Sequence, residues 1–196
     1  MSTEEVKVKY GLSNVYVVPR TVADSKVTYG TPLHIPGAVS LSTSRDTSQN
    51  IFYADNSSYF VTNSKNSMSA DLEVADIPRD VLLKYLGYVE DKNGGILETN
   101  TAVTPSFALL FQIETDVQNR RVALFNCTAV ESDEDNNTEE DSIEPSTSKL
   151  TLTIKGDQLS SGKAAFRKVV EPSDTDYGNF FTTVTAPEEK TASTGA

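Results

Sequence analysis

Phe107–Glu114 (FALLFQIE) and Arg121–Val130 (RVALFNCTAV) are the two stretches of this chain that decide its fold. Both are rich in aromatic and β-branched residues and are too short to favour helices. The first stretch alternates with one fully apolar face, and the second places different apolar residues on its two faces. Strands that are apolar on both sides are central strands covered on both sides, so we expect a hairpin in the middle of a sheet. The residues assigned to one face are Phe107, Leu109, Phe111 and Ile113 in the first stretch and Val122, Leu124 and Val130 in the second, where Ala123, Phe125 and Cys127 take the other face.

The rest of the chain predicts about ten to twelve short strands in total, separated by Gly, Pro, Asn and Ser. Pro19 is expected to end the second strand, and the polar run Thr43–Asn50 is expected to form a loop. The predicted strands outside the central hairpin and the aromatic hairpin described below are Val6–Tyr10, Val15–Val18, Val27–Tyr29, Leu33–Ile35, Ala38–Ser42, Met68–Ala75, Ile96–Leu97, Lys149–Lys155, Ala164–Val170 and Asn179–Thr185.

One helix is predicted, over Ile77–Leu86 (IPRDVLLKYL). Asp76 can cap its first turn and Gly87 can end it. Its apolar residues form one stripe, so the helix should pack on the sheet as a structural cover.

The charge of the chain argues against a nucleic-acid-binding protein. Its 196 residues have a formal net charge of −11, and Glu131–Glu144 alone holds eight acids and no base. Affinity for phosphate backbones comes from Lys and Arg, and no basic stripe is present. No apolar run is long enough to span a bilayer, and the first ten residues do not form a secretory signal. The single cysteine cannot form an internal disulfide, which fits a protein made in a reducing cytoplasm.

No set of residues predicts catalysis, a cofactor site or a metal site. His34 is the only histidine and lies between two prolines, and Cys127 lies in an apolar run, so both favour packing over a Cys/His dyad. In the acidic segment Asp133, Asp135, Asn137 and Glu144 match positions of a calcium loop. Thr138 stands where that loop needs Gly, so a solvated acidic loop is the preferred interpretation.

Ile51–Ala54 and Tyr59–Thr62 flank Asp55–Ser58 and predict a hairpin rich in aromatic residues. One interpretation is ordinary cross-strand aromatic pairing. The other is a projecting hairpin that packs on another subunit, because exposed aromatic clusters need cover. The candidate subunit-contact residues are Phe52, Tyr53, Tyr59 and Phe60.

An ordered set of stretches resembles the major tail, or tail tube, proteins of siphophages of Gram-positive hosts. The resemblance runs from about Val6 to Pro187 and is carried by Gly30–Ser42 (GTPLHIPGAVSLS), Phe52–Ser58 (FYADNSS), Asp71–Gly87 (DLEVADIPRDVLLKYLG), Pro105–Phe111 (PSFALLF) and Glu140–Ile154 (EDSIEPSTSKLTLTI). It implies a mainly β subunit, an antiparallel β-sandwich whose sheets form a barrel, with one flanking α-helix. It also implies hexameric rings that stack into a tube for genome ejection, with no catalytic residues.

On this view residues 1–187 form one tail tube domain, with a projecting loop at about 43–67, an acidic loop at about 131–148 and a mobile tail at 188–196. The resemblance implies that the partners are further copies of the chain and other tail proteins such as the tape measure and terminator proteins. DNA would pass through without specific binding, and no membrane would be involved. The alternative is a monomeric β-sandwich binding or decoration module with a cation-dependent acidic loop. A hydrolase that uses the loop carboxylates is a more distant third hypothesis.

Overall fold

The computed structural model describes residues 11–24, 26–54, 57–100, 104–114, 119–132 and 146–190, with the side chains of 48–66 left undescribed. It is mainly antiparallel β with one helix, as the sequence predicts. The elements are β1 (Leu12–Ala23), β2 (Lys26–Tyr29), β3 (Leu33–Ile35), β4 (Ala38–Ala54), β5 (Ser57–Val74), α1 (Arg79–Tyr85), β6 (Val89–Glu90), β7 (Ile96–Leu97), β8 (Phe107–Ile113), β9 (Arg121–Glu131), β10 (Ser148–Ile154), β11 (Asp157–Gln158), β12 (Ala164–Ala165) and β13 (Arg167–Val170).

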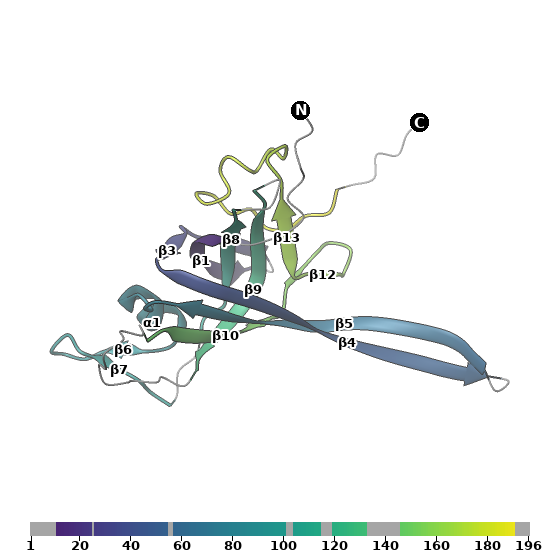
Figure 1. The fold of residues 1–196 in the computed structure, drawn as a ribbon, viewed down its shortest axis with the longest axis horizontal. Helices are drawn as coiled ribbons and strands as arrows, with labels where there is room; N and C mark the ends of the chain where they lie inside the picture. Colours follow the sequence, from purple (N-terminus) through teal and green to yellow (C-terminus); the bar gives the residue numbers. More distant parts are fainter. Residues whose placement is uncertain are drawn as a thin grey trace, which may run out of the picture.

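The main sheet runs in the order β2-β1-β8-β9-β10-β5-β4, with β13 also paired to β9 and β3 to β1. It folds into two layers: β1, β8, β9 and β13 form the upper layer in Figure 1, and β10, β5 and β4 lie below them. Strands β4 and β5 continue beyond the body as a long hairpin (Figure 1).

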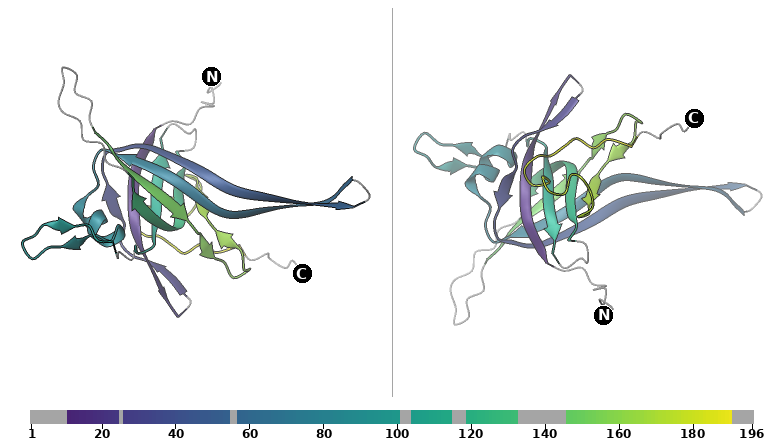
Figure 2. Two further views of the ribbon diagram at one scale, coloured as in Figure 1. Left: turned by 90° about the horizontal axis from the view of Figure 1, so that it is seen from below. Right: turned by 90° about the horizontal axis from the view of Figure 1, so that it is seen from above.

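The central hairpin is covered on both faces, which confirms the prediction from its two apolar stretches. Leu109 and Leu124 belong to a core between the two layers, which α1 closes with Val81 and Tyr85. On the other face a second core contains Ala108, Leu110, Ala123, Phe125 and Phe180. Residues 171–190 lie above this second core, as Figure 2 (right) shows.

The predicted faces of β9 are wrong beyond Phe125, because Asn126 forms a β-bulge. Leu109 pairs with Leu124 but Phe107 pairs with Cys127, so β9 holds one extra residue here. Asn126 has φ of 54°, and its side-chain amide donates to the carbonyl of Gly156 at 2.8 Å. The bulge reverses the alternation. Cys127 therefore joins the core between the layers, while Val130 is 66% exposed.

Helix α1 begins two residues later than predicted, and Asp76 does not cap it. Pro78 precedes the first helical residue with extended backbone (ψ 138°), and no side chain caps this end. Pro78 instead accepts hydrogen bonds at its carbonyl from the amides of Val81 and Leu82. Gly87 follows the helix with φ of 79°, as predicted, because glycine adopts this conformation without a Cβ clash.

Several strand predictions are wrong, and the predicted strand Ala164–Val170 is divided between β12 and β13. Strand β1 continues through Pro19, whose carbonyl accepts a hydrogen bond from the amide of Gly30 at 2.9 Å. Thr43–Asn50 forms part of β4, because β5 pairs with it along this whole length. Asn179–Thr185 is not a strand, because residues 179–182 form a turn in which the carbonyl of Asn179 accepts from the amides of Thr182 and Thr183. The predicted strand Val6–Tyr10 lies outside the described residues.

Candidate assembly surface

The lower layer and the C-terminal half of β9 (Cys127–Glu131) form a four-stranded sheet, β4-β5-β10-β9, with one solvent face. Strands β10, β5 and β4 lie toward the viewer in Figure 2 (left). Alternation places the apolar residues of these strands in the core and short polar residues on the opposite face. We call this opposite face the hydroxyl face, because it consists of Ser40, Ser42, Ser44, Asp46, Ser67, Ser69, Asp71, Glu73, Thr128, Val130, Ser132, Lys149, Thr151 and Thr153.

Hydroxyl groups hold the carboxylates of this face. Glu73 accepts hydrogen bonds from Thr147 at 2.6 Å and from Ser40 at 3.0 Å, and these bonds lower its pKa below the usual value. Thr151 donates to Asp71 at 2.9 Å, and Ser67 donates to Asp46 at 2.8 Å. The arrangement favours ionised acids among small neutral groups, so the face is negative and presents few long side chains.

The same sheet has two outer strands. Among the described strands, β5 is the only partner of β4. Strand β9 is paired to β10 over Cys127–Glu131, but its pairing with β8 ends at Cys127, so Thr128–Glu131 has a described strand on one side only. Free strand edges present unpaired amides and carbonyls that another chain can pair with.

The aromatic residues predicted as subunit contacts lie on the projecting part of β4 and β5. The backbone of Phe52 is directly opposite that of Phe60, and Tyr53 is opposite Ser58. This confirms the hairpin. The side chains of Phe52, Tyr53, Tyr59 and Phe60 are outside the described part of the structure, so their role as contacts stays a prediction.

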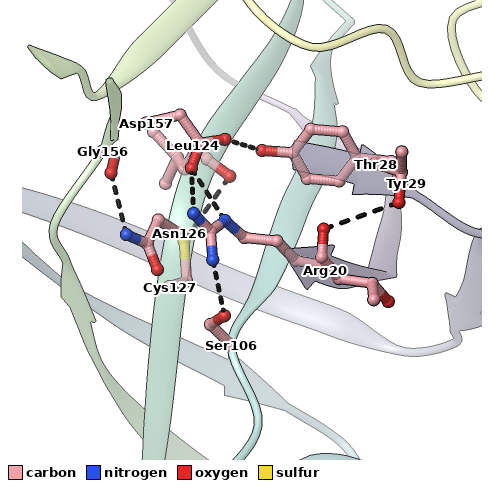
Figure 3. A network of polar contacts seen from close by, with 10 residues as sticks. Arg20, Thr28, Tyr29, Ser106, Leu124, Asn126, Cys127, Gly156 and Asp157 are labelled. Carbon is pink, nitrogen blue, oxygen red and sulfur yellow. Dashed lines mark hydrogen bonds and ion pairs between the residues drawn. The ribbon is translucent and has the colours of Figure 1, made fainter. Parts of the chain in front are cut away.

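A buried polar cluster joins β1, β2 and β11, and nothing in the sequence predicts it (Figure 3). Asp157 is 1% exposed, and Arg20 donates from Nε to its Oδ1 at 2.7 Å while also donating to Ser106 at 3.2 Å. The hydroxyl of Tyr29 donates to Oδ2 of Asp157. Burial, and then the adjacent Asp157 carboxylate, raise the pKa of Tyr29. Each of these polar side chains has a hydrogen-bond or ion-pair partner within the cluster. The role of the cluster is therefore to hold β1, β2 and β11 together.

The structure separates the two residues considered for nucleophilic chemistry. Cys127 is fully buried, its Sγ lies 3.5 Å from the carbonyl of Leu124, and burial raises its pKa to about 12. His34 is exposed on β3 and its ring lies against that of Tyr16 at a tilt of 49°, with ring centroids 4.9 Å apart. A thiol that stays protonated in an apolar core is not a nucleophile.

The described residues contain no group of three or more His, Cys, Asp or Glu side chains that could hold a metal ion. The calcium-loop candidates Asp133, Asp135, Asn137 and Glu144 fall outside those residues. Within the described ranges, no helix is long and apolar enough to cross a membrane.

Comparison with solved structures finds tube and cap components of contractile injection systems. The sheath-tube complex of an extracellular contractile injection system (PVC, extended state) is 12% identical, with a TM-score of 0.49, and the match covers 87% of this chain and 99% of that chain. The tube-terminating cap of the anti-feeding prophage is 11% identical, with a TM-score of 0.47, and the match covers 86% and 96%. No curated protein sequence matches this chain.

A family model described as phage tail tube protein matches residues 43–181. The matched range contains the hydroxyl face almost entirely, the projecting hairpin from Thr43 onward, the central strands and β13. Because the match covers well over half of the chain, the protein belongs to the phage tail tube protein family and is a structural component of the virion tail, not an enzyme.

Proposed function

We propose that this protein is the major tail tube subunit of a siphophage of Gram-positive bacteria. It is made in the host cytoplasm and assembles as stacked hexameric rings that conduct the genome during ejection. The observation that carries the proposal is one sheet with a negative, hydroxyl-rich face and an open edge on each side.

The open edges explain how rings close. The outer edge of β4 in one copy pairs with Thr128–Glu131 in the next, which joins the four-stranded sheets into a continuous barrel. The contact is head-to-tail, because two different edges meet. Such a contact generates a closed ring when a whole number of identical rotations from one copy to the next completes a full turn.

The hydroxyl face then lines the bore. Asp46, Asp71 and Glu73 repel DNA phosphates and outnumber Lys149, the one cation of this face, which lies opposite Glu73. A duplex can therefore slide without binding to a specific site.

The projecting hairpin provides contacts between copies, with Phe52, Tyr53, Tyr59 and Phe60 covered by a neighbouring subunit. The ends of this tube meet a terminator protein, and its bore encloses a tape measure protein during assembly, as the resemblance to siphophage tail tube proteins implies.

Electron microscopy of the concentrated protein tests the assembly, and rings or tubes with six subunits per ring are expected. Val39→Asp places a charge on the outer strand β4, where Val39 is 53% exposed, and should abolish rings. Val89→Asp is the matched control, because Val89 is 45% exposed on β6, outside this sheet. A protein that stays monomeric at every concentration would refute the proposed function.

A further inference from the structure

A groove opens beside the outer edge of β4. It is lined by Leu12, Val39, Leu41, Phe111, Ile113 and Arg167. Its apolar floor continues the core between the two layers, because Leu12, Leu41 and Ile113 pack against that core. An apolar groove beside a free strand edge is suited to an added strand, which supplies both backbone hydrogen bonds and apolar cover.

The chain itself enters the described structure at this groove. Gly11 lines it, and the amide of Glu114 donates to the carbonyl of Gly11 at 2.9 Å. Gly11 has φ of 86°, a conformation in which glycine can turn the chain sharply. The described part of the chain therefore begins beside Val39 and Leu41, at the first residues of β4.

The sequence before Gly11 has the pattern of an edge strand. Glu4–Tyr10 (EEVKVKY) places Val6, Val8 and Tyr10 on one side and Lys7 and Lys9 on the other. This is the alternation that a strand over an apolar groove requires.

We propose that Glu4–Tyr10 adds to β4 of its own chain as an antiparallel strand and caps this edge before assembly. The direction follows from the position of Gly11, which brings Tyr10 to the Val39 end of β4. The register that fits is Tyr10 opposite Val39, Val8 opposite Leu41, Val6 opposite Thr43 and Glu4 opposite Arg45.

On the groove side, the attraction between opposite charges favours this register. Neither Arg45 nor Arg167 has an ion pair or hydrogen bond with a described side chain. Burial lowers the pKa of Arg167, and the positive charges of Arg45 and Arg120 lower it further, so cations crowd here. Glu4 opposite Arg45 supplies the missing negative charge.

The hydroxyl-face side of the added strand is complementary as well. Lys9 falls opposite Ser40, which binds Glu73, and Lys7 falls opposite Ser42, whose partner in β5 is Asp71. The ammonium groups of Lys9 and Lys7 would therefore lie near the carboxylates of Glu73 and Asp71. A shift by one residue would put the lysines over the apolar groove and the valines in solvent, so the register is strongly specified.

The cap has a consequence that rests on the proposed function. If β4 pairs with the next subunit in the ring, Glu4–Tyr10 occupies the same edge and must leave before the ring closes. The segment therefore raises the concentration at which subunits form rings, because a neighbouring copy must displace it from β4.

Disulfide trapping tests the docking. In Lys7→Cys/Ser42→Cys the two cysteines face each other, and mild oxidation of dilute protein should give an intrachain disulfide, detected by mass and by gel mobility without reductant. Lys7→Cys/Thr43→Cys is the register control, with the cysteines on opposite faces, and should cross-link at least tenfold less. Cys127 is fully buried and does not compete.

The outcomes separate docking from assembly. Oxidised Lys7→Cys/Ser42→Cys should form no tubes, and reductant should restore them to the level of unmodified protein. No intrachain disulfide, equal cross-linking of the control, or a disulfide only between chains would overturn the proposal, the last by identifying a second copy as the occupant. If the disulfide forms but unmodified protein makes no tubes, the proposed function fails while the docking stands.

Discussion

At the scale of single residues, the cluster around Asp157 is the most sensitive point of the fold. Asp157→Ala leaves the guanidinium of Arg20, 12% exposed, without its carboxylate and also removes the acceptor of Tyr29. Breaking a buried pair by removing one partner costs about 3–5 kcal/mol. We expect a loss of that size in the free energy of unfolding, measured by urea denaturation.

Ser106→Ala is the control for this cluster, since it removes one hydrogen bond to Arg20 and keeps the ion pair. It should cost about 1 kcal/mol. Comparable losses for the two variants would show that the ion pair is not what holds β1 and β11 together.

Which residues are buried could be predicted from local pattern, but which distant residues meet could not. The burial of Cys127 follows from its apolar neighbours, and the structure confirms it. Its face depends on the bulge at Asn126, which the side-chain bond to Gly156 stabilises. Likewise Arg20 and Asp157 are 137 positions apart, and nothing near either residue indicates the other.

At the scale of elements, the alternation of apolar and polar residues predicts a strand correctly where one face of the strand is buried. Composition misleads where a strand is polar because one of its faces is exposed, or where strand-like residues form a turn. Leu150, Leu152 and Ile154 of β10 point into the core as predicted. The polar part of β4 was predicted as a loop, because a strand exposed on one face and rich in Ser and Thr has a loop-like composition. Asn179–Thr185 has strand-like residues, but Phe180 is 6% exposed in the second core and the local turn bonds bring it there.

The projecting hairpin makes a prediction at this scale. Replacing Phe52, Tyr53, Tyr59 and Phe60 with serine should leave the melting temperature of the monomer within about 3 °C of the original, because the hairpin extends beyond the body (Figure 1). Tube formation should be lost, since the proposed contacts between copies are removed. Light scattering against concentration measures assembly, with Ser58→Ala as the control. Full assembly of the serine variant would exclude these aromatics as contacts.

At the scale of the whole molecule, the hydroxyl face is built from strands that are distant in sequence. Asp71 lies on β5, Thr151 on β10 and Val130 on β9, and only the pairing order brings them onto one surface. The sign of the net charge could be predicted from composition, but not which acids share a face. The acidic segment Glu131–Glu144 dominates the composition, whereas the bore we propose depends on two carboxylates elsewhere.

Reversing the charges of Asp71 and Glu73 tests whether the hydroxyl face lines the bore. Asp71→Lys/Glu73→Lys should still form tubes, because both side chains lie on the solvent face and away from the backbone edges. Glu98→Lys/Glu188→Lys makes the same change in net charge on exposed residues outside the hydroxyl face.

If the hydroxyl face lines the bore, short duplex DNA should bind tubes of the first variant at low salt and dissociate as salt rises, because lysines there release counterions from the phosphates. Fluorescence anisotropy with labelled DNA measures this binding, and the control tubes should bind at least tenfold less. Equal binding by the two variants would mean that the hydroxyl face does not meet DNA, and the bore would then have to be formed by another surface of the subunit.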